Sequence, residues 1–133
     1  MDEVSKKILI IDDEPDLVQA VEARLQRNGY ETITASDGQE GLRLAKAIRP
    51  ALIILDLNLP KLAGEEVCRA IREDQDRIFN RTPILMLTAK TDDADRVIGK
   101  VLDANHYLTK PFESEVLLSK VKVLIDEFSK PHK

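Results

Sequence analysis

Short apolar runs and stretches of helical periodicity alternate five times along this chain, and no other feature restricts the fold as strongly. Three of the runs are almost wholly apolar, as expected for strands that are buried on both faces of a sheet, whereas the second run is weaker and the fifth is short. Apolar residues then recur every three or four positions, which is typical of an amphipathic helix. The predicted strands cover residues 8–11, 32–35, 51–55, 83–87 and 106–108.

Strict alternation of strands and helices predicts an α/β fold with a single doubly wound, five-stranded parallel sheet and five helices. Because crossovers between parallel strands are right-handed, few topologies remain, and we expect the flavodoxin-like strand order 2-1-3-4-5. We interpret residues 1–133 as one domain with a core at about residues 6–128, since no repeat or linker interrupts the pattern. The fourth helix is expected near residues 92–102.

Composition and charge exclude several classes of protein. A single cysteine, Cys68, leaves no partner for an intramolecular disulfide or a multi-cysteine metal site. No apolar run approaches the roughly 18 residues of a membrane span, and no signal-peptide pattern is present, so we expect no membrane partner and a cytoplasmic location. The formal net charge of −4 leads us to expect no direct nucleic-acid partner.

Polar residues stand where four of the predicted strands end. Asp12 and Asp13 follow the first strand, Asp56 the third, Thr88 the fourth and Lys110 the fifth. In parallel sheets of this kind, ligands bind outside the carboxyl ends of the strands. If the first and third strands are neighbours, three carboxylates converge there, and two such charges about 4 Å apart repel by about 4 kcal/mol at an effective dielectric constant of about 20. The cluster therefore needs a cation or a proton, and Mg²⁺ suits hard oxygen ligands.

Phosphoryl transfer onto a carboxylate is the chemistry that fits these side chains. Asp56 would attack phosphorus and form an acyl phosphate, which is an established use of aspartate as a nucleophile. Lys110 would share the developing negative charge, and the hydroxyl of Thr88 would donate a hydrogen bond to a phosphoryl oxygen.

Four short segments carry a resemblance to a known family. They read ILIIDDE at residues 8–14, LDLNLP at 55–60 with Gly64 beyond it, LTAK at 87–90 and YLTKPF at 107–112. Any one of them would be weak evidence, but all four occur in order and at the right spacing. The chain resembles a response-regulator receiver domain of two-component signalling over essentially its whole length.

The resemblance implies a phosphorylation site with a divalent cation. Asp56 would accept a phosphoryl group from a phosphohistidine of a sensor histidine kinase or a histidine phosphotransfer protein. Asp13, Asp56 and the backbone carbonyl of Asn58 would bind Mg²⁺ directly, with Mn²⁺ as an alternative, and Asp12 would act largely through water. Asn58 also occupies a position from which side chains modulate attack of water on the acyl phosphate. On this interpretation the chain is not an enzyme beyond its own phosphotransfer and autodephosphorylation.

The resemblance also implies a switch. Thr88 would turn toward the phosphoryl group, and Tyr107 would rotate inward behind it. The bond between Lys110 and Pro111 is usually cis in the family, which would hold the lysine over the pocket. A downstream protein would bind the face formed by the fourth helix, the fifth strand and the fifth helix. We expect no output domain within this sequence, so the chain would be a stand-alone regulator or the receiver of a longer protein.

Two stretches depart from the pattern of receivers found in winged-helix transcription factors. Those receivers usually read Gly-Ala-Asp-Asp where this chain reads DANH at residues 103–106, and their last helix is richer in arginine. Such residues normally build ion pairs across a dimer face, so we do not expect that mode of dimerisation. Residues 73–82 are also slightly long for the family, and we expect them to extend the third helix or the loop after it.

Three other functions share part of this pattern. A phosphatase of the haloacid dehalogenase type would need the motif Asp-x-Asp-x-Thr, which residues 56–60 do not supply, and sustained turnover of a phosphomonoester would reveal it. A flavin carrier would need a phosphate-binding loop rich in Ser, Thr and Gly after the first strand, where this chain has three consecutive acids. A scaffold that works without phosphorylation would not need the complete set of pocket residues.

Overall fold

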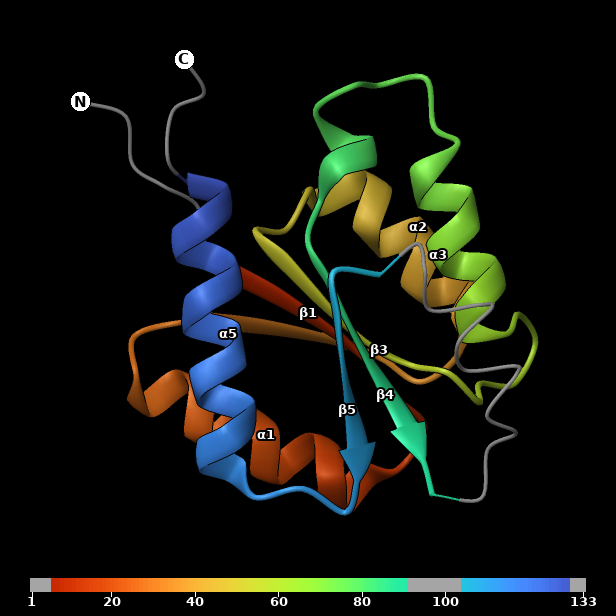
Figure 1. Cartoon of the computed structure of the whole chain (residues 1–133). Helices are drawn as coiled ribbons and strands as arrows, with labels where there is room; N and C mark the ends of the chain where they lie inside the picture. The colour runs from red at the N-terminus through yellow and green to blue at the C-terminus, as the bar shows by residue number, and fades with distance from the viewer. Residues whose placement is uncertain (1–5, 91–103, 130–133) are drawn as a thin grey trace.

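The computed structural model describes residues 6–90 and 104–129. Within them, five parallel strands form one sheet in the order β2-β1-β3-β4-β5 (Figure 1), so the predicted fold class and strand order are confirmed. The described residues also form four α-helices and one short 3₁₀ helix, none of which has the length and apolar character of a membrane span. The helix predicted near residues 92–102 lies outside the described residues.

Four of the five strands are longer than the runs that predicted them, and the third keeps its predicted length but is shifted by one residue. The strands are β1 (Lys7–Ile11), β2 (Glu31–Ala35), β3 (Leu52–Asp56), β4 (Ile84–Ala89) and β5 (His106–Lys110). The helices are α1 (Pro15–Arg27), α2 (Gly38–Ile48), α3 (Gly64–Arg72), the 3₁₀ helix η1 (Phe79–Arg81) and α5 (Ser114–Ser129). Strands β3, β4 and β5 end one or two residues later than predicted, because backbone pairing continues through polar residues such as Asp56 and Thr88.

Two of the described helices cover each face of the sheet. Helices α1 and α5 lie on one face, and α2 and α3 lie on the other (Figure 1). Residues 8–11 of β1 are all apolar because side chains alternate between the two faces of the sheet and both faces are covered. Ile8 and Ile10 pack in the core with α1 and α5, whereas Leu9 and Ile11 pack in the core with α2 and α3.

Local sequence signals set the ends of the helices. Pro15 begins α1, and Gly29, with a φ of 88°, follows its end. Asp37 caps α2, since its Oδ1 accepts a hydrogen bond from the amide of Glu40 at 2.8 Å. Arg49 ends the same helix in the left-handed conformation, with a φ of 49°.

The connection between α3 and β4 is a loop containing η1, so residues 73–82 extend the loop rather than the helix. Arg72 closes this loop from the end of α3. Its guanidinium donates hydrogen bonds to the backbone oxygens of Asn80 and Thr82 at 2.9 and 2.8 Å, and to Oδ1 of Asn105 at 2.9 Å. The loop is thereby tied to the residue that precedes β5.

A second set of contacts orders the middle of the same loop. Oδ1 of Asp76 accepts hydrogen bonds from the amides of Ile78 and Phe79. The other carboxylate oxygen pairs with the guanidinium of Arg49, which follows α2. The ring of Phe79 is buried in the core, so the loop has both polar and apolar anchors.

Candidate functional site

The strand order brings three carboxylates together at the carboxyl ends of two neighbouring strands. Asp12 and Asp13 directly follow β1, and Asp56 is the last residue of β3, which pairs with β1. One side-chain oxygen of each residue lies within 4.8 Å of the other two. Asp12 and Asp56 are 2% and 5% exposed, whereas Asp13 is exposed. The three acids named from the sequence therefore form one cluster.

Lys110 reaches this cluster from the end of β5, two strands away from β3. Its Nζ lies 2.9 Å from Oδ2 of Asp12 and 3.3 Å from Oδ2 of Asp56. Its shortest contact, 2.7 Å, is with Oε1 of Glu14. Glu14 was not predicted as a partner of the lysine. The signal that could have identified it is its place as the third of three consecutive acids.

Burial and neighbouring charges shift the pKa values of both Asp56 and Lys110. Burial raises the pKa of Asp56 from its ordinary value of 3.8 to about 6, and the charge of Asp12 adds to the rise. A hydrogen bond from the amide of Asn58 to Oδ1 of Asp56, at 3.1 Å, and the Lys110 ammonium act in the opposite direction. Burial also disfavours the charge of Lys110, but its contacts with Glu14, Asp12 and Asp56 outweigh this and hold its pKa above its ordinary value. Lys110 is therefore cationic beside a carboxylate whose charge is only partly compensated.

The backbone after β3 is fixed around Asp56. The amide of Leu57 donates to the carbonyl oxygen of Leu87 at 2.9 Å, and the amide of Gly64 donates to the carbonyl oxygen of Leu57 at 3.0 Å. A Cβ atom at Gly64 would lie 2.2 Å from the carbonyl oxygen of Asp56, which is far inside any non-bonded contact. Only glycine allows α3 to begin so close to the backbone of Asp56.

Thr88 and Tyr107 lie on the neighbouring strands β4 and β5. Thr88 is buried, and its Oγ1 lies 3.3 Å from Oγ1 of Thr109, its partner across the two strands. Thr109 could not be predicted as that partner, because a hydroxyl–hydroxyl contact between strands depends on their register. Tyr107 is 55% exposed. In this structure the aromatic side chain thus faces outward.

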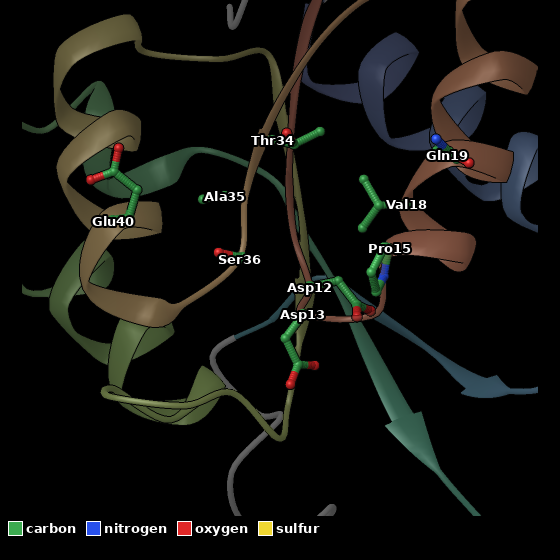
Figure 2. Close-up of a pocket in the computed structure, with 9 residues that line it drawn as sticks. All are labelled: Asp12, Asp13, Pro15, Val18, Gln19, Thr34, Ala35, Ser36 and Glu40. Atoms are coloured by element: carbon green, nitrogen blue, oxygen red, sulfur yellow. The ribbon is translucent and has the colours of Figure 1, made fainter.

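A pocket adjoins the acid cluster. Its volume is about 400 Å³, and it lies between the start of α1, the end of β2 and the start of α2. In Figure 2, Asp12 and Asp13 lie together at one end of the pocket, and Ser36 and Glu40 line the side toward α2. Two of the three acids, Asp12 and Asp13, therefore line a pocket that lies beyond the carboxyl ends of β1 and β2, between α1 and α2.

The donor set fits a divalent cation. Oδ2 of Asp12 is buried, and its recorded partner among the described residues is the Lys110 ammonium, 2.9 Å away. A buried carboxylate oxygen in this state, next to Asp13 and Asp56, favours a cation. All three acids supply hard oxygen atoms of the kind that Mg²⁺ binds.

A doubly wound parallel sheet with acids after β1 and β3 and a lysine at the end of β5 is the arrangement expected of a phosphorylatable signalling domain. A family model for the response regulator receiver domain matches residues 8–122, and the chain belongs to this family. The resemblance stated from the sequence is confirmed. These similarities give no support to the phosphatase and flavin-carrier alternatives.

Two curated relatives and one solved structure illustrate the similarity. The alkaline phosphatase synthesis transcriptional regulatory protein PhoP of Bacillus subtilis is 47% identical over 122 residues, which are 92% of this chain and 49% of PhoP. The DNA-binding response regulator MtrA of Mycolicibacterium smegmatis is 38% identical over 122 residues, 92% of this chain and 51% of MtrA. The receiver domain of the sensor histidine kinase PA1611 from Pseudomonas aeruginosa PAO1 was solved with a magnesium ion coordinated in the active site cleft. It is 32% identical, with a TM-score of 0.80, and the match covers 92% of this chain and 98% of that domain.

These relatives overturn one expectation from the sequence. We expected no direct nucleic-acid partner from the net charge of −4, and this prediction is wrong, since one relative is named as a transcriptional regulatory protein and another as DNA-binding. The chain spans about half the length of these two curated relatives. The net charge of one receiver segment says nothing about the charge of the other half of such proteins, so composition could not exclude the partner.

Proposed function

We propose that this receiver accepts a phosphoryl group on Asp56 from a phosphohistidine of a sensor histidine kinase or a histidine phosphotransfer protein. The observation that carries the proposal is the position of the Lys110 ammonium, 3.3 Å from Oδ2 of Asp56 and 2.9 Å from Oδ2 of Asp12. Two acids beside an acceptor carboxylate are suited to a cation, and a lysine in contact with the acceptor is suited to the incoming phosphoryl oxygens. The proposed receiver core spans about residues 6–128.

In the proposed transfer, one oxygen of the ionised Asp56 carboxylate attacks phosphorus. The new O–P bond forms as the N–P bond of the donor breaks, and the leaving imidazole takes up a proton. Lys110 stabilises the negative charge on the phosphoryl oxygens, and Thr88 donates a hydrogen bond to one of them. In a separate step, the oxygen of water attacks phosphorus as the bond to Asp56 breaks, which releases inorganic phosphate and a proton and restores the Asp56 carboxylate, so the chain catalyses its own dephosphorylation. Asn58, two residues beyond Asp56, would influence the approach of that water.

Magnesium is the proposed cofactor, with Mn²⁺ as an alternative. Asp13, Asp56 and the backbone carbonyl of Asn58 would bind the ion directly, and Asp12 would act largely through water. The bound ion would neutralise the charge that the donor phosphoryl group brings to the acids. The magnesium ion in the cleft of the PA1611 receiver supports this assignment, and so does the buried Oδ2 of Asp12 in the acid cluster.

We also propose that phosphorylation changes the face that includes β5 and α5. The phosphoryl group would draw the hydroxyl of Thr88 away from Thr109, where it now lies at 3.3 Å. Tyr107 lies on the next strand and is 55% exposed, and its ring would then rotate inward. A downstream protein would recognise the altered face formed by the fourth helix, β5 and α5.

Incubation with phosphoramidate or acetyl phosphate and Mg²⁺ tests the acceptor. The protein should gain one phosphoryl group by mass spectrometry, and Asp56→Asn should abolish the gain because the amide is a far weaker nucleophile. Asp16→Asn is a matched control, since it removes an exposed aspartate in the first turn of α1. Phosphorylation that persists in Asp56→Asn would move the acceptor to another residue.

A further inference from the structure

Glu14 makes the shortest contact of the Lys110 ammonium. Its Oε1 lies 2.7 Å from Nζ, compared with 2.9 Å for Asp12 and 3.3 Å for Asp56. The Glu14 side chain is 57% exposed, whereas those of Asp12 and Asp56 are 0% and 6% exposed. The lysine is therefore shared between a carboxylate at the solvent-exposed rim of the site and two carboxylates inside it.

Among the described residues, the contact with Lys110 is the one recorded interaction of the Glu14 side chain. The residue occupies the N-cap position of α1, but its side chain makes no capping hydrogen bond, and Pro15 begins the helix. Its amide donates to Oδ1 of Asp12 at 2.9 Å, which a change of side chain would leave in place. Among the described residues, Lys110 is the recorded polar partner of the Glu14 carboxylate.

The same carboxylate oxygens serve the lysine and would serve a divalent cation. Nζ of Lys110 contacts Oδ2 of Asp12 and Oδ2 of Asp56, and both acids belong to the cluster that fits such an ion. An ammonium and a metal ion that approach the same oxygens repel each other and compete for them. A third carboxylate that draws the ammonium toward the rim weakens this competition.

We infer that Glu14 is a positioning residue for Lys110, which holds the ammonium toward the rim of the site and so leaves Asp12 and Asp56 more available to a divalent cation. The inference rests on the proposed function, because the cation that benefits is the one proposed for phosphotransfer. It assigns a role to a residue that lies outside the proposed set of metal ligands. It also explains why the lysine is closest to a carboxylate that is more than half exposed.

The test measures Mg²⁺ affinity in the full chain by titration followed with ¹H–¹⁵N NMR. Glu14→Gln keeps an oxygen within reach of Lys110 but removes the charge, and we expect the Kd for Mg²⁺ to rise about three- to tenfold. This is below the usual loss for a buried outer-shell partner, because the glutamate is partly screened by water. Asp16→Asn removes an equal charge two residues further on, and it should change the Kd by less than about 1.5-fold.

A double-mutant cycle tells whether Glu14 acts by positioning Lys110 or by attracting Mg²⁺ directly with its charge. Lys110→Met removes the ammonium and keeps most of the aliphatic stem, so in that background Glu14→Gln should have little effect, less than about twofold. In the metal-free protein, the ¹⁵N resonance of Lys110 Nζ should shift in Glu14→Gln and stay unchanged in Asp16→Asn. This second readout does not depend on phosphorylation or on the metal.

Three outcomes would overturn the inference. If Glu14→Gln raises the Kd for Mg²⁺ equally in the wild-type and the Lys110→Met backgrounds, Glu14 acts on the ion through its charge alone and not through Lys110. An unchanged Kd in Glu14→Gln, while the wild type binds Mg²⁺, would refute the positioning role and leave the proposed function intact. Absence of Mg²⁺ binding by the wild type would refute both this inference and the proposed cofactor.

Discussion

At the carboxyl end of the sheet, three carboxylates share the ammonium of Lys110, whereas at the opposite end the guanidinium of Arg72 is matched to three hydrogen-bond acceptors. The strands β4 and β5 point toward the first region, and the loop after α3 lies at the other end (Figure 1). In the first region, Asp56 has a raised pKa, and the recorded partner of a buried Asp12 oxygen is this shared ammonium. In the second, each oxygen of Asp76 has a donor.

The difference shows how polar groups can serve two purposes in one small fold. Polar groups that hold a loop in place are paired, because an unpaired buried group costs stability. Polar groups at the acid cluster are incompletely paired, which lowers stability but leaves them able to bind a ligand. The comparison therefore predicts that substitutions at the two ends change stability in opposite directions.

The largest change is expected at the loop end. Arg72→Ala should lower the free energy of unfolding by about 3 kcal/mol, because the backbone oxygens of Asn80 and Thr82 lose a charged donor and Asn105 loses its link to α3. Urea unfolding followed by circular dichroism measures the loss. Arg69→Ala removes an exposed arginine from the same helix and should have a much smaller effect. Equal effects of the two substitutions would refute the anchoring role of Arg72.

Asp56→Asn should act in the opposite direction and stabilise the fold at neutral pH by about 2 kcal/mol. The pKa of Asp56 rises from 3.8 to about 6 on folding, so this carboxyl group favours the folded state below about pH 4. That contribution is lost as the pH rises through about 6, because ionisation then favours the unfolded chain. Urea unfolding in EDTA from pH 4 to 8 should show the advantage of the variant growing up to about pH 6 and then levelling off. A constant difference across this range would contradict the raised pKa.

The smallest of the three effects concerns the proposed cation. Mg²⁺ at about ten times its Kd should raise the free energy of unfolding by about 1.4 kcal/mol, because the ion binds the folded state. EDTA should reverse the change, and Asp13→Asn should reduce it by removing a proposed ligand. Thermal unfolding with and without the metal measures the shift. If Mg²⁺ leaves the unfolding midpoint of the wild type unchanged, the acid cluster is not a cation site under those conditions.

The fold and the acid cluster could be predicted because they depend on short-range sequence patterns. Four- and five-residue apolar runs identify strands that are buried on both faces, and the strand order then determines which strand ends are neighbours. The strand order alone predicts that Asp12, Asp13 and Asp56 lie close together, since β1 and β3 are adjacent. Lys110 was also predictable, because it follows the fifth strand in the same direction.

The remaining features depend on side-chain reach and on contacts between distant segments. Glu14 could have pointed to solvent, and its contact with Lys110 joins residues that are 96 positions apart. Arg72 reaches Asn105 across 33 positions, through a loop whose length gave no indication of its hydrogen bonds. The sequence predicts ends of β3, β4 and β5 that are one or two residues too early, because a polar residue is typical of a strand end, although Asp56 and Thr88 are buried and still paired.

The contact between Gly64 and the carbonyl oxygen of Asp56 limits how the site could be moved to another protein. A methyl group at this position would meet that oxygen at 2.2 Å. A designer who transplants the three carboxylates and the lysine onto a new parallel sheet would therefore also have to transplant a helix that begins with a residue lacking a side chain. Otherwise the helix would have to start further away, and the backbone after the engineered acceptor would lose the hydrogen bond that Gly64 donates to Leu57 here.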